Sequence, residues 1–541
     1  ITVASAISKT AGADATLTLN AHNNINLNAS ITSTTGQLNM VFNPDSDASG
    51  AGAVVLGTTT LNANGGTISA AGKTVSKSSG TATINSAMTM GSLNISGGIL
   101  AGTGNLTTMG TSTVSAAAYL NGPAWNQGGI LNITGTTGYI RLDNGSVLEN
   151  ASGAVINITS NQTTAFATYA GTATVNNAGT INKQAGSGAT LSIAGTGLAF
   201  NNTGTVNINS GKLSVGSGTA GSMDSGSYNI ASGAILDFYQ GTRHFAAGSS
   251  INGSGTWTAS GGTLDFSTGS ARNFSNFTSF FATLTGSDPL TFGETLTWSG
   301  TYTGSGGLTT TGATTITSYP TLSGATWNQQ GTLNLSSGYL TLVSGAILNN
   351  ANGAVINIAS TRDYAFTTSS GTATFNNAGT INKQAGSAAI QTIGGTTTHT
   401  FNNTGTVNVN SGTLNILASG SDTGIYNTAS GATLNLSGGT RNFDTGINIT
   451  GQGTFQLGGA TLGGAATLSP ASAFLWTGGS YTGAGLSTAG TTTISGAATL
   501  NGQTWTNSGA LEIINGGSLT LNNGAALNNA AAGRLNINTS S

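Results

Sequence analysis

Apolar and polar residues alternate along this chain in short stretches, which are separated by corners rich in glycine and asparagine. Typical stretches read "QQGTLNL", "ANGAVINI", "NNAGTINK" and "NNTGTVNV", with Leu, Ile or Val at every second position after the glycine. Such alternation places the apolar side chains on one face of a strand and Thr, Asn and Ser on the other. The pattern therefore predicts many strands of about four to six residues and no helix.

Six successive corner glycines recur at similar intervals; they are Gly331, Gly353, Gly379, Gly405, Gly431 and Gly453. Without helices the strands cannot form βαβ crossovers. A coil instead lets each strand hydrogen-bond to its counterpart one turn away, with Gly or Asn at corner positions of positive φ. We therefore predict an all-β fold, a right-handed parallel β-helix (solenoid) of about 22–26 residues per turn. It would be an elongated rod, on the order of 110 Å long.

A longer repeat of 180–200 residues contains the short one. Its copies align around Trp125, Trp327 and Trp505, and the stretch "NNAGTINKQAGS" occurs unchanged at 176–187 and 376–387. Repetition at a fixed interval is the mark of a repeat architecture. We divide the chain into an N-terminal segment, a first copy, a second copy about one turn shorter, and a partial third copy expected to continue beyond the chain shown: 1–97, 98–299, 300–477 and 478–541.

The difference in length between the first two copies is close to one predicted turn. Trp257 precedes Phe455 by 198 residues, whereas Trp298 precedes Trp476 by 178, so about 20 residues are missing from the later copy. Loss of a whole turn keeps the remaining turns in register, and loss of a fraction would not. This difference supports a solenoid over an open sheet or a sandwich.

Composition narrows the classes of protein that remain. Only 26 of 541 residues are charged, about 5%, where about 25% is usual. The net charge of −2 and the absence of cationic clusters argue against a nucleic-acid partner. The absence of cysteine suits a chain that is exported unfolded through an oxidising compartment. No apolar run is long enough for a membrane span, and any export signal is expected upstream of Ile1.

Paired asparagines fall near the predicted corners, at 176–177, 201–202, 376–377, 402–403 and 528–529. Asparagine side chains carry both donors and an acceptor, so stacked amides can hydrogen-bond from one turn to the next. Proline is rare, with five residues, as expected where every stacked strand needs its N–H.

Two sets of charged residues are candidates for chemistry. Asp237 and Asp265 are separated by little more than one predicted turn and could meet on neighbouring turns as a carboxylate pair. We favour two unrelated aspartates, since Asp237 aligns with Asn435 in the second copy. Arg243 and Arg441 share the motif "GTR" followed two residues later by Phe. Either could bind a sugar or a carboxylate, but we favour an arginine packed over an aromatic ring.

A metal site is not expected. His22, His244 and His399 are far apart in the sequence. Asp45 and Asp47 in "NPDSD" could hold calcium in a loop, but the glycine–aspartate repeats of calcium-binding β-rolls are missing.

Aromatic and threonine-rich stretches also have two readings. The tryptophans that recur in the long repeat could stack on carbohydrate, but their matching positions favour packing; they are Trp125, Trp327 and Trp505, and Trp298 and Trp476. Threonine runs at 58–60 and 491–493 raise the idea of ice binding, and we favour ordinary outward strand positions. We therefore assign no catalytic, cofactor-binding or metal-binding residue and no cofactor.

The N-terminal stretches "ITVASAISKTAGADATLTLNAHNNINLNASITSTTGQLNMVF" (1–42) and "GAVVLGTTTLNANGGTISAAG" (52–72) resemble the filamentous-haemagglutinin-like exoproteins of two-partner secretion systems in Gram-negative bacteria. The resemblance is confined to the start of the chain, roughly residues 1–80. It implies a β-helical shaft, export through an outer-membrane pore, and a role in adhesion, aggregation or biofilm. The Asn-Pro signatures of the family's secretion domain are not evident, because the one Asn-Pro here, Asn43-Pro44, lies in a predicted loop.

Three functions remain open at this point. The first is a non-enzymatic structural shaft of a secreted surface adhesin. Its partner would be a host, neighbouring-cell or matrix surface, and carbohydrate is one candidate ligand on that surface. The second is a subunit of an extracellular filament or matrix fibre, built by end-to-end association of β-helices. The third is a carbohydrate-active β-helix enzyme, which needs an acidic cluster that the sequence does not offer.

Overall fold

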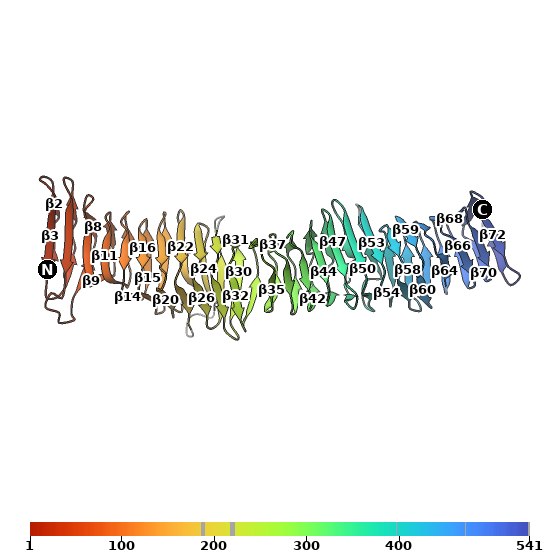
Figure 1. Ribbon diagram of the computed structural model, residues 1–541, viewed down its shortest axis with the longest axis horizontal. Coiled ribbons are helices and arrows are strands. Elements are labelled where there is room, and N and C mark those ends of the chain that lie inside the picture. The colour runs from red at the N-terminus through yellow and green to blue at the C-terminus, as the bar shows by residue number, and fades with distance from the viewer. Residues whose placement is uncertain (185–189, 217–221, 396–397, 471, 539–541) are drawn as a thin grey trace. The chain divides into compact units, whose positions relative to one another are not determined.

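The computed structural model describes residues 1–184, 190–216, 222–395, 398–470 and 472–538. The chain divides into two compact units, unit 1 (Ile1–Thr268) and unit 2 (Gly269–Ser541). The described residues contain strands and no helix, and the strands of each unit stack in parallel as a β-solenoid, with about 25 turns counted over both units. The predicted all-β solenoid is confirmed. Figure 1 shows the strands of each unit stacked as successive turns.

Each turn of unit 2 contributes three strands to parallel sheets, and strand n pairs with strand n+3. Thus β44 pairs with β47, β45 with β48 and β46 with β49, all in parallel. The exception is that β60 (Asn448–Gly451) and β63 (Thr467–Leu468) do not pair, and β63 begins a separate four-stranded sheet. The strands used below are β44 (Thr326–Gln329), β45 (Thr332–Leu335), β46 (Leu340–Val343), β47 (Ala346–Asn350), β48 (Val355–Ile358), β49 (Tyr364–Thr367), β50 (Ala373–Asn377), β51 (Thr380–Lys383), β53 (His399–Asn403), β56 (Gly420–Asp422), β57 (Ile425–Thr428), β59 (Thr440–Phe443), β61 (Thr454–Leu457) and β64 (Ala473–Trp476).

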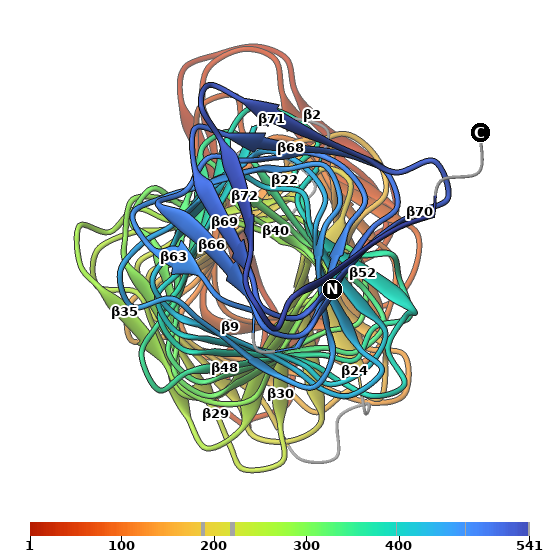
Figure 2. The same ribbon diagram turned by 90° about the vertical axis from the view of Figure 1, so that its right-hand side faces the viewer.

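Unit 1 is wound in the same way, since β15 pairs with β18, β16 with β19 and β17 with β20. Figure 2 looks along the stacked turns, and loops project outward between the strands. The strands of unit 1 used below are β15 (Ala117–Asn121), β16 (Ala124–Gln127), β17 (Ile130–Ile133), β18 (Tyr139–Asp143), β19 (Val147–Asn150), β20 (Val155–Ile158), β21 (Thr164–Thr168), β22 (Ala173–Asn177), β23 (Thr180–Lys183), β24 (Thr190–Gly195), β27 (Lys212–Gly216), β30 (Ile235–Gln240), β31 (Thr242–Phe245) and β34 (Thr263–Phe266).

Turn length varies more widely than the sequence predicted. Met88 pairs with Leu106 across a short turn, whereas Ile25 pairs with Val54 across a long one. The long turn contains the predicted loop after Asn43, where β6 (Leu38–Asn43) ends. A turn can change length without disturbing its neighbours because the loops project outward while the strands keep their pairing.

The core is a column of apolar side chains inside the coil. The alternation predicted from the sequence is present: in β20, Ile156 and Ile158 are buried, and the residues beside them are half-exposed. Pairing stacks equivalent positions, so that Leu131, Ile156 and Ile181 lie one above the other. Each further turn therefore extends the same column.

Corner glycines serve two purposes, only one of which was expected. Gly353 and Gly431 have φ of +83° and +77°, as predicted for corners. The other four do not have positive φ; at each a Cβ atom would lie 2.1–2.4 Å from a backbone carbonyl oxygen of the neighbouring turn, and they are Gly331, Gly379, Gly405 and Gly453. Glycine is needed there because two backbones approach closely.

Between corresponding aromatic residues, the chain has one turn fewer in unit 2 than in the earlier part of the sequence. In unit 2, β61 pairs directly with β64, which joins Phe455 to the strand of Trp476. In the first copy an additional strand, β36 (Phe277–Phe280), comes between Trp257 and Trp298, and it is β36 that pairs with the strand of Trp298. The division into repeat copies remains a prediction from the sequence, and the boundary between the two compact units falls inside the first copy.

Candidate functional site

The two aspartates considered as a carboxylate pair make separate contacts. Asp237 on β30 is 2% exposed; it accepts a hydrogen bond of 2.8 Å from Thr258 Oγ1 and lies 2.7 Å from Lys212 Nζ. Asp265 on β34 lies 2.9 Å from His244 Nδ1. Strand register places Thr258 beside Asp237. The structure therefore does not bring the two carboxylates together, in line with the favoured reading.

The three histidines lie in different environments. His22 is exposed, 3.9 Å from Asp47, and His244 contacts the carboxylate just described. His399 is buried at the start of β53, with Nδ1 3.1 Å from Thr368 Oγ1, and burial lowers the pKa of its imidazole to about 4. Among the described residues, no group of three His, Cys, Asp or Glu is placed to hold a metal ion.

The loop with the candidate calcium ligands is held by its own hydrogen bonds. Asp45 Oδ1 accepts hydrogen bonds from Ser49 Oγ and from the backbone N–H of Gly50, at 3.0 and 2.9 Å. Lys73 Nζ lies 3.7 Å from the other carboxylate oxygen. The carboxylate of Asp45 thus closes the loop and faces a lysine.

All six tryptophans are buried, with at most 2% of any side chain exposed. The indole Nε1 of Trp125, Trp327 and Trp505 donates in each case to a threonine hydroxyl of the preceding turn, at 3.0, 3.0 and 2.9 Å. These side chains pack the core, so they are not available as platforms for carbohydrate.

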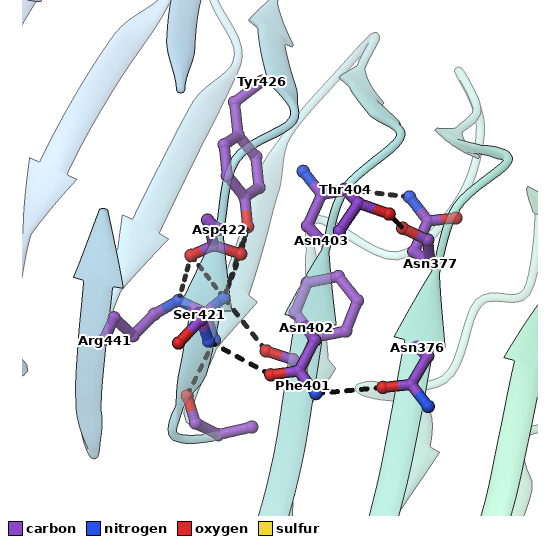
Figure 3. A network of polar contacts seen from close by, with 11 residues as sticks. Asn376, Asn377, Phe401, Asn402, Asn403, Thr404, Ser421, Asp422, Tyr426 and Arg441 are labelled. Atoms are coloured by element: carbon purple, nitrogen blue, oxygen red, sulfur yellow. Dashed lines mark hydrogen bonds and ion pairs between the residues drawn. The ribbon is translucent and has the colours of Figure 1, made fainter. Parts of the chain in front are cut away.

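The arginines of the two "GTR" motifs form buried ion pairs. Arg441 on β59 is 0% exposed; its Nε donates to Asp422 Oδ2 at 2.9 Å, and its Nη2 donates to Oδ1 at 2.5 Å. The hydroxyl of Tyr426 donates to Asp422 at 2.9 Å, and the guanidinium lies 5.3 Å from the ring centre of Phe401. Figure 3 shows this network between β53, β56 and β59. Unit 1 repeats it with Arg243, as the equivalent contacts show.

This network is the main polar feature that sequence reasoning missed. The favoured reading, an arginine over an aromatic ring, is correct as far as it goes, but the acidic partner was not identified. A signal was present: aspartate, tyrosine and arginine follow each other at the same intervals in both copies, as Asp224, Tyr228 and Arg243 and as Asp422, Tyr426 and Arg441. The interval from acid to base is one short turn.

Burial dominates the electrostatics of the network. It raises the pKa of the Asp422 carboxyl, and the guanidinium of Arg441 opposes that rise. It also raises the pKa of the Tyr426 hydroxyl well above its ordinary value, so this tyrosine is a neutral hydrogen-bond donor. Because a buried charge without a partner is very costly, each member of the network depends on the others.

The paired asparagines form two ladders, as predicted. In the inner ladder Asn350 Nδ2 donates to Asn377 Oδ1, and Asn377 Nδ2 donates to Asn403 Oδ1, both at 2.7 Å and fully buried. In the outer ladder the direction is reversed, since Asn402 donates to Asn376 at 2.9 Å (Figure 3). The pairs lie at the ends of strands and have no positive φ, unlike the predicted corner positions.

The charged residue of the repeated twelve-residue stretch is also structural. Lys383 ends β51, and its side chain is 0% exposed. Its Nζ donates to the carbonyl oxygens of Ala388 and Ser411 at 3.0 and 2.7 Å, so it ties the following loop to the next turn. Lys183 donates to Ser210 O at 2.7 Å in unit 1. Residues 185–187 of the first stretch lie outside the described residues.

Comparisons with protein-family models, with curated proteins and with solved structures found no match to this chain. In the described part of the chain, no helix is long and apolar enough to cross a membrane.

Proposed function

We propose that this chain is a non-enzymatic structural shaft of a large secreted surface adhesin of the filamentous-haemagglutinin-like kind. It would be exported by a Gram-negative bacterium through an outer-membrane pore, and it would mediate cell–cell or cell–surface attachment and biofilm formation. The observation that carries the proposal is the parallel coil of each unit, which repeats one simple turn over hundreds of residues.

The use of the charged residues supports a structural role. The buried charges hold strands and loops of neighbouring turns together, as Arg441 does with Asp422 and as Lys383 does with the carbonyl of Ser411. Asp237, the one candidate acid that is buried, is already bound by a lysine and a threonine. Such groups are occupied in holding the coil, which favours a shaft over an enzyme.

The adhesin part of the proposal rests on the resemblance of residues 1–42 and 52–72 to the exoprotein family. Its test is a comparison of bacteria that carry the chain with the same strain after deletion of it, by crystal-violet staining of surface-attached cells. We expect attachment to fall on deletion and to return on complementation; unchanged attachment would contradict the adhesin role. The purified chain should release no reducing ends from a panel of polysaccharides, whereas release would favour an enzyme.

A filament subunit is the second candidate, because the parallel turns of each unit offer the same kind of pairing that a turn from another copy would use. Electron microscopy of the purified chain at several concentrations separates the two candidates. Discrete particles at every concentration favour the shaft, and fibres that lengthen with concentration favour the filament.

A further inference from the structure

A groove on the surface of unit 1 lies between two tyrosines that come from different turns. It has a cavity volume of about 350 Å³ and is lined by residues of β21, β24 and β30, with Tyr169 just after β21 and Tyr239 on β30. From β21 to β30 there are three steps of strand pairing, so the tyrosines are separated by roughly 14 Å along the stack. The volume is within the usual range for ligand sites.

The floor and rim of the groove have the chemistry of a neutral polar site. Small residues, Ala194 and Gly195 among them, form part of the lining, together with Thr164, Thr196 and the amide of Gln240. The lining residues that the structure describes include no charged side chain. Two aromatic rings with hydroxyl and amide groups between them suit a ligand that has apolar faces and many hydroxyls.

One wall of the groove is held in place by an ion pair. Tyr169 is 66% exposed, yet the guanidinium of Arg141 lies 4.8 Å from its ring centre. Arg141 Nε donates to Asp143 Oδ2 at 2.5 Å, and Asp143 Oδ1 in turn accepts the backbone N–H of Tyr169 at 2.9 Å. The ring is therefore fixed before any ligand arrives, which lowers the entropy cost of binding.

A buried hydroxyl at the groove lacks a partner. Thr168 lines the groove and is 4% exposed, and its Oγ1 has no hydrogen-bond partner among the described residues. The equivalent Thr368 in the second copy bonds to His399, whose place is taken by Leu198 in the first copy. The Oγ1 atom itself is closed to solvent, so it marks a difference between the two copies and is not one of the groups that face the groove.

The second copy of the repeat serves as an internal comparison. Its framework is the same, but Tyr169 and Tyr239 are replaced by Ser369 and Ser437. Leu417 replaces Gly216, over which the ring of Tyr239 lies so closely that a Cβ would be 2.9 Å from it. The two tyrosine walls of the groove are thus specific to the first copy, so the architecture of the repeat does not require them.

We propose that the groove between Tyr169 and Tyr239 binds a neutral oligosaccharide. The tyrosine rings contact the apolar faces of the sugar rings, and the threonine hydroxyls and the amide of Gln240 hydrogen-bond to its hydroxyls. This site goes beyond the structural role proposed above, and it holds or fails independently of that role.

The test uses the full chain and three probes: maltotetraose, cellotetraose and triacetylchitotriose. Binding is followed by saturation-transfer NMR and quantified by calorimetry, and circular dichroism checks that each variant is folded. We expect at least one probe to bind the wild type. Its Kd should rise at least about tenfold in the double variant Tyr169→Ser, Tyr239→Ser, which introduces the residues of the second copy.

Two further variants make the result specific. Gly216→Leu introduces the residue of the second copy, collides with the side chains of Tyr239 and Gln240, and should weaken binding to a similar degree. Tyr364→Ser removes an exposed tyrosine of unit 2 and should leave Kd unchanged. The proposal is overturned if none of the three probes binds the wild type, or if binding survives in the folded double variant. An equal loss on Tyr364→Ser would overturn it as well.

Discussion

Two neighbouring asparagines of unit 2 allow the cost of breaking a buried amide ladder to be measured against an exposed one. Asn377 is 1% exposed; it donates to Asn403 Oδ1 and accepts from Asn350 Nδ2, both at 2.7 Å. Replacing Asn377 by alanine leaves the buried Oδ1 of Asn403 without this donor, which costs about 1–3 kcal/mol in the free energy of unfolding. It also removes one hydrogen bond of Asn350, at a further cost of about 1 kcal/mol. We expect Asn377→Ala to lower the free energy of unfolding by about 2–4 kcal/mol.

Asn376→Ala is the matched control. Asn376 also has two ladder bonds, to Asn349 and from Asn402, both at 2.9 Å, but its side chain is half-exposed. Water can replace the lost partners there, so we expect a cost below about 1 kcal/mol. Both changes are Asn to Ala in β50, so the difference reports burial alone.

The assay is equilibrium unfolding in urea, combined with amide hydrogen exchange of peptides that cover β50 and β53. Exchange is needed because turns of a solenoid can open locally, and a local cost can then escape a global measurement. The reasoning is refuted if Asn376→Ala and Asn377→Ala cost the same, or if the exposed position costs more.

Three other changes follow from the same contacts. Arg441→Met leaves the Asp422 carboxylate buried without its partner and should cost about 3–5 kcal/mol in urea unfolding; the double variant with Asp422→Leu should recover most of that loss, and no recovery would show that the charges are not the cause. Burial lowers the pKa of His399 from 6.5 to about 4, so between these values only the unfolded chain takes up a proton. Stability should therefore fall by about 3 kcal/mol as the pH falls from 6.5 to 4, and His399→Leu should remove that part of the pH dependence; an unchanged profile would contradict it. Gly379→Ala would place a Cβ 2.3 Å from a backbone oxygen of the neighbouring turn, so its melting temperature should fall by several degrees, and an unchanged melting temperature would show that the backbone can move aside.

The fold could be predicted from the sequence because one rule acts at every turn. Alternation with period two places residues such as Ile156 and Ile181 inside, and strand pairing then stacks them. The asparagine ladders were predictable for the same reason, since equivalent residues of successive turns must lie side by side in a parallel coil. A property shared by neighbouring turns is visible as a repeat in the sequence.

Contacts between unlike residues of different turns were not predictable in this way. The partner of Arg441 is Asp422, one short turn earlier, whereas other turns of the chain are considerably longer, as the one that joins Ile25 to Val54. A distance along the sequence therefore does not give the distance in space until the register of that particular turn is known. For the same reason, the sequence spacing of Asp237 and Asp265 allowed a contact between them, whereas in the structure each carboxylate has its own partner.

The two copies of the repeat are identical at 176–187 and 376–387, whereas the residues of the groove differ between them. The structure explains both observations. In the second stretch, four residues have contacts that a substitution would break. Asn377 lies in the buried ladder and Gly379 lies against a backbone carbonyl oxygen. Ile381 lies in the core, and Lys383 donates to the backbone of the next turn. Such a stretch tolerates little change after duplication. Surface positions on the same framework are free to differ, and Tyr169, which corresponds to a serine in the second copy, is one of them. Within one chain, identity between the copies therefore marks the residues that hold the coil, and differences between them mark the places where a separate binding function can arise.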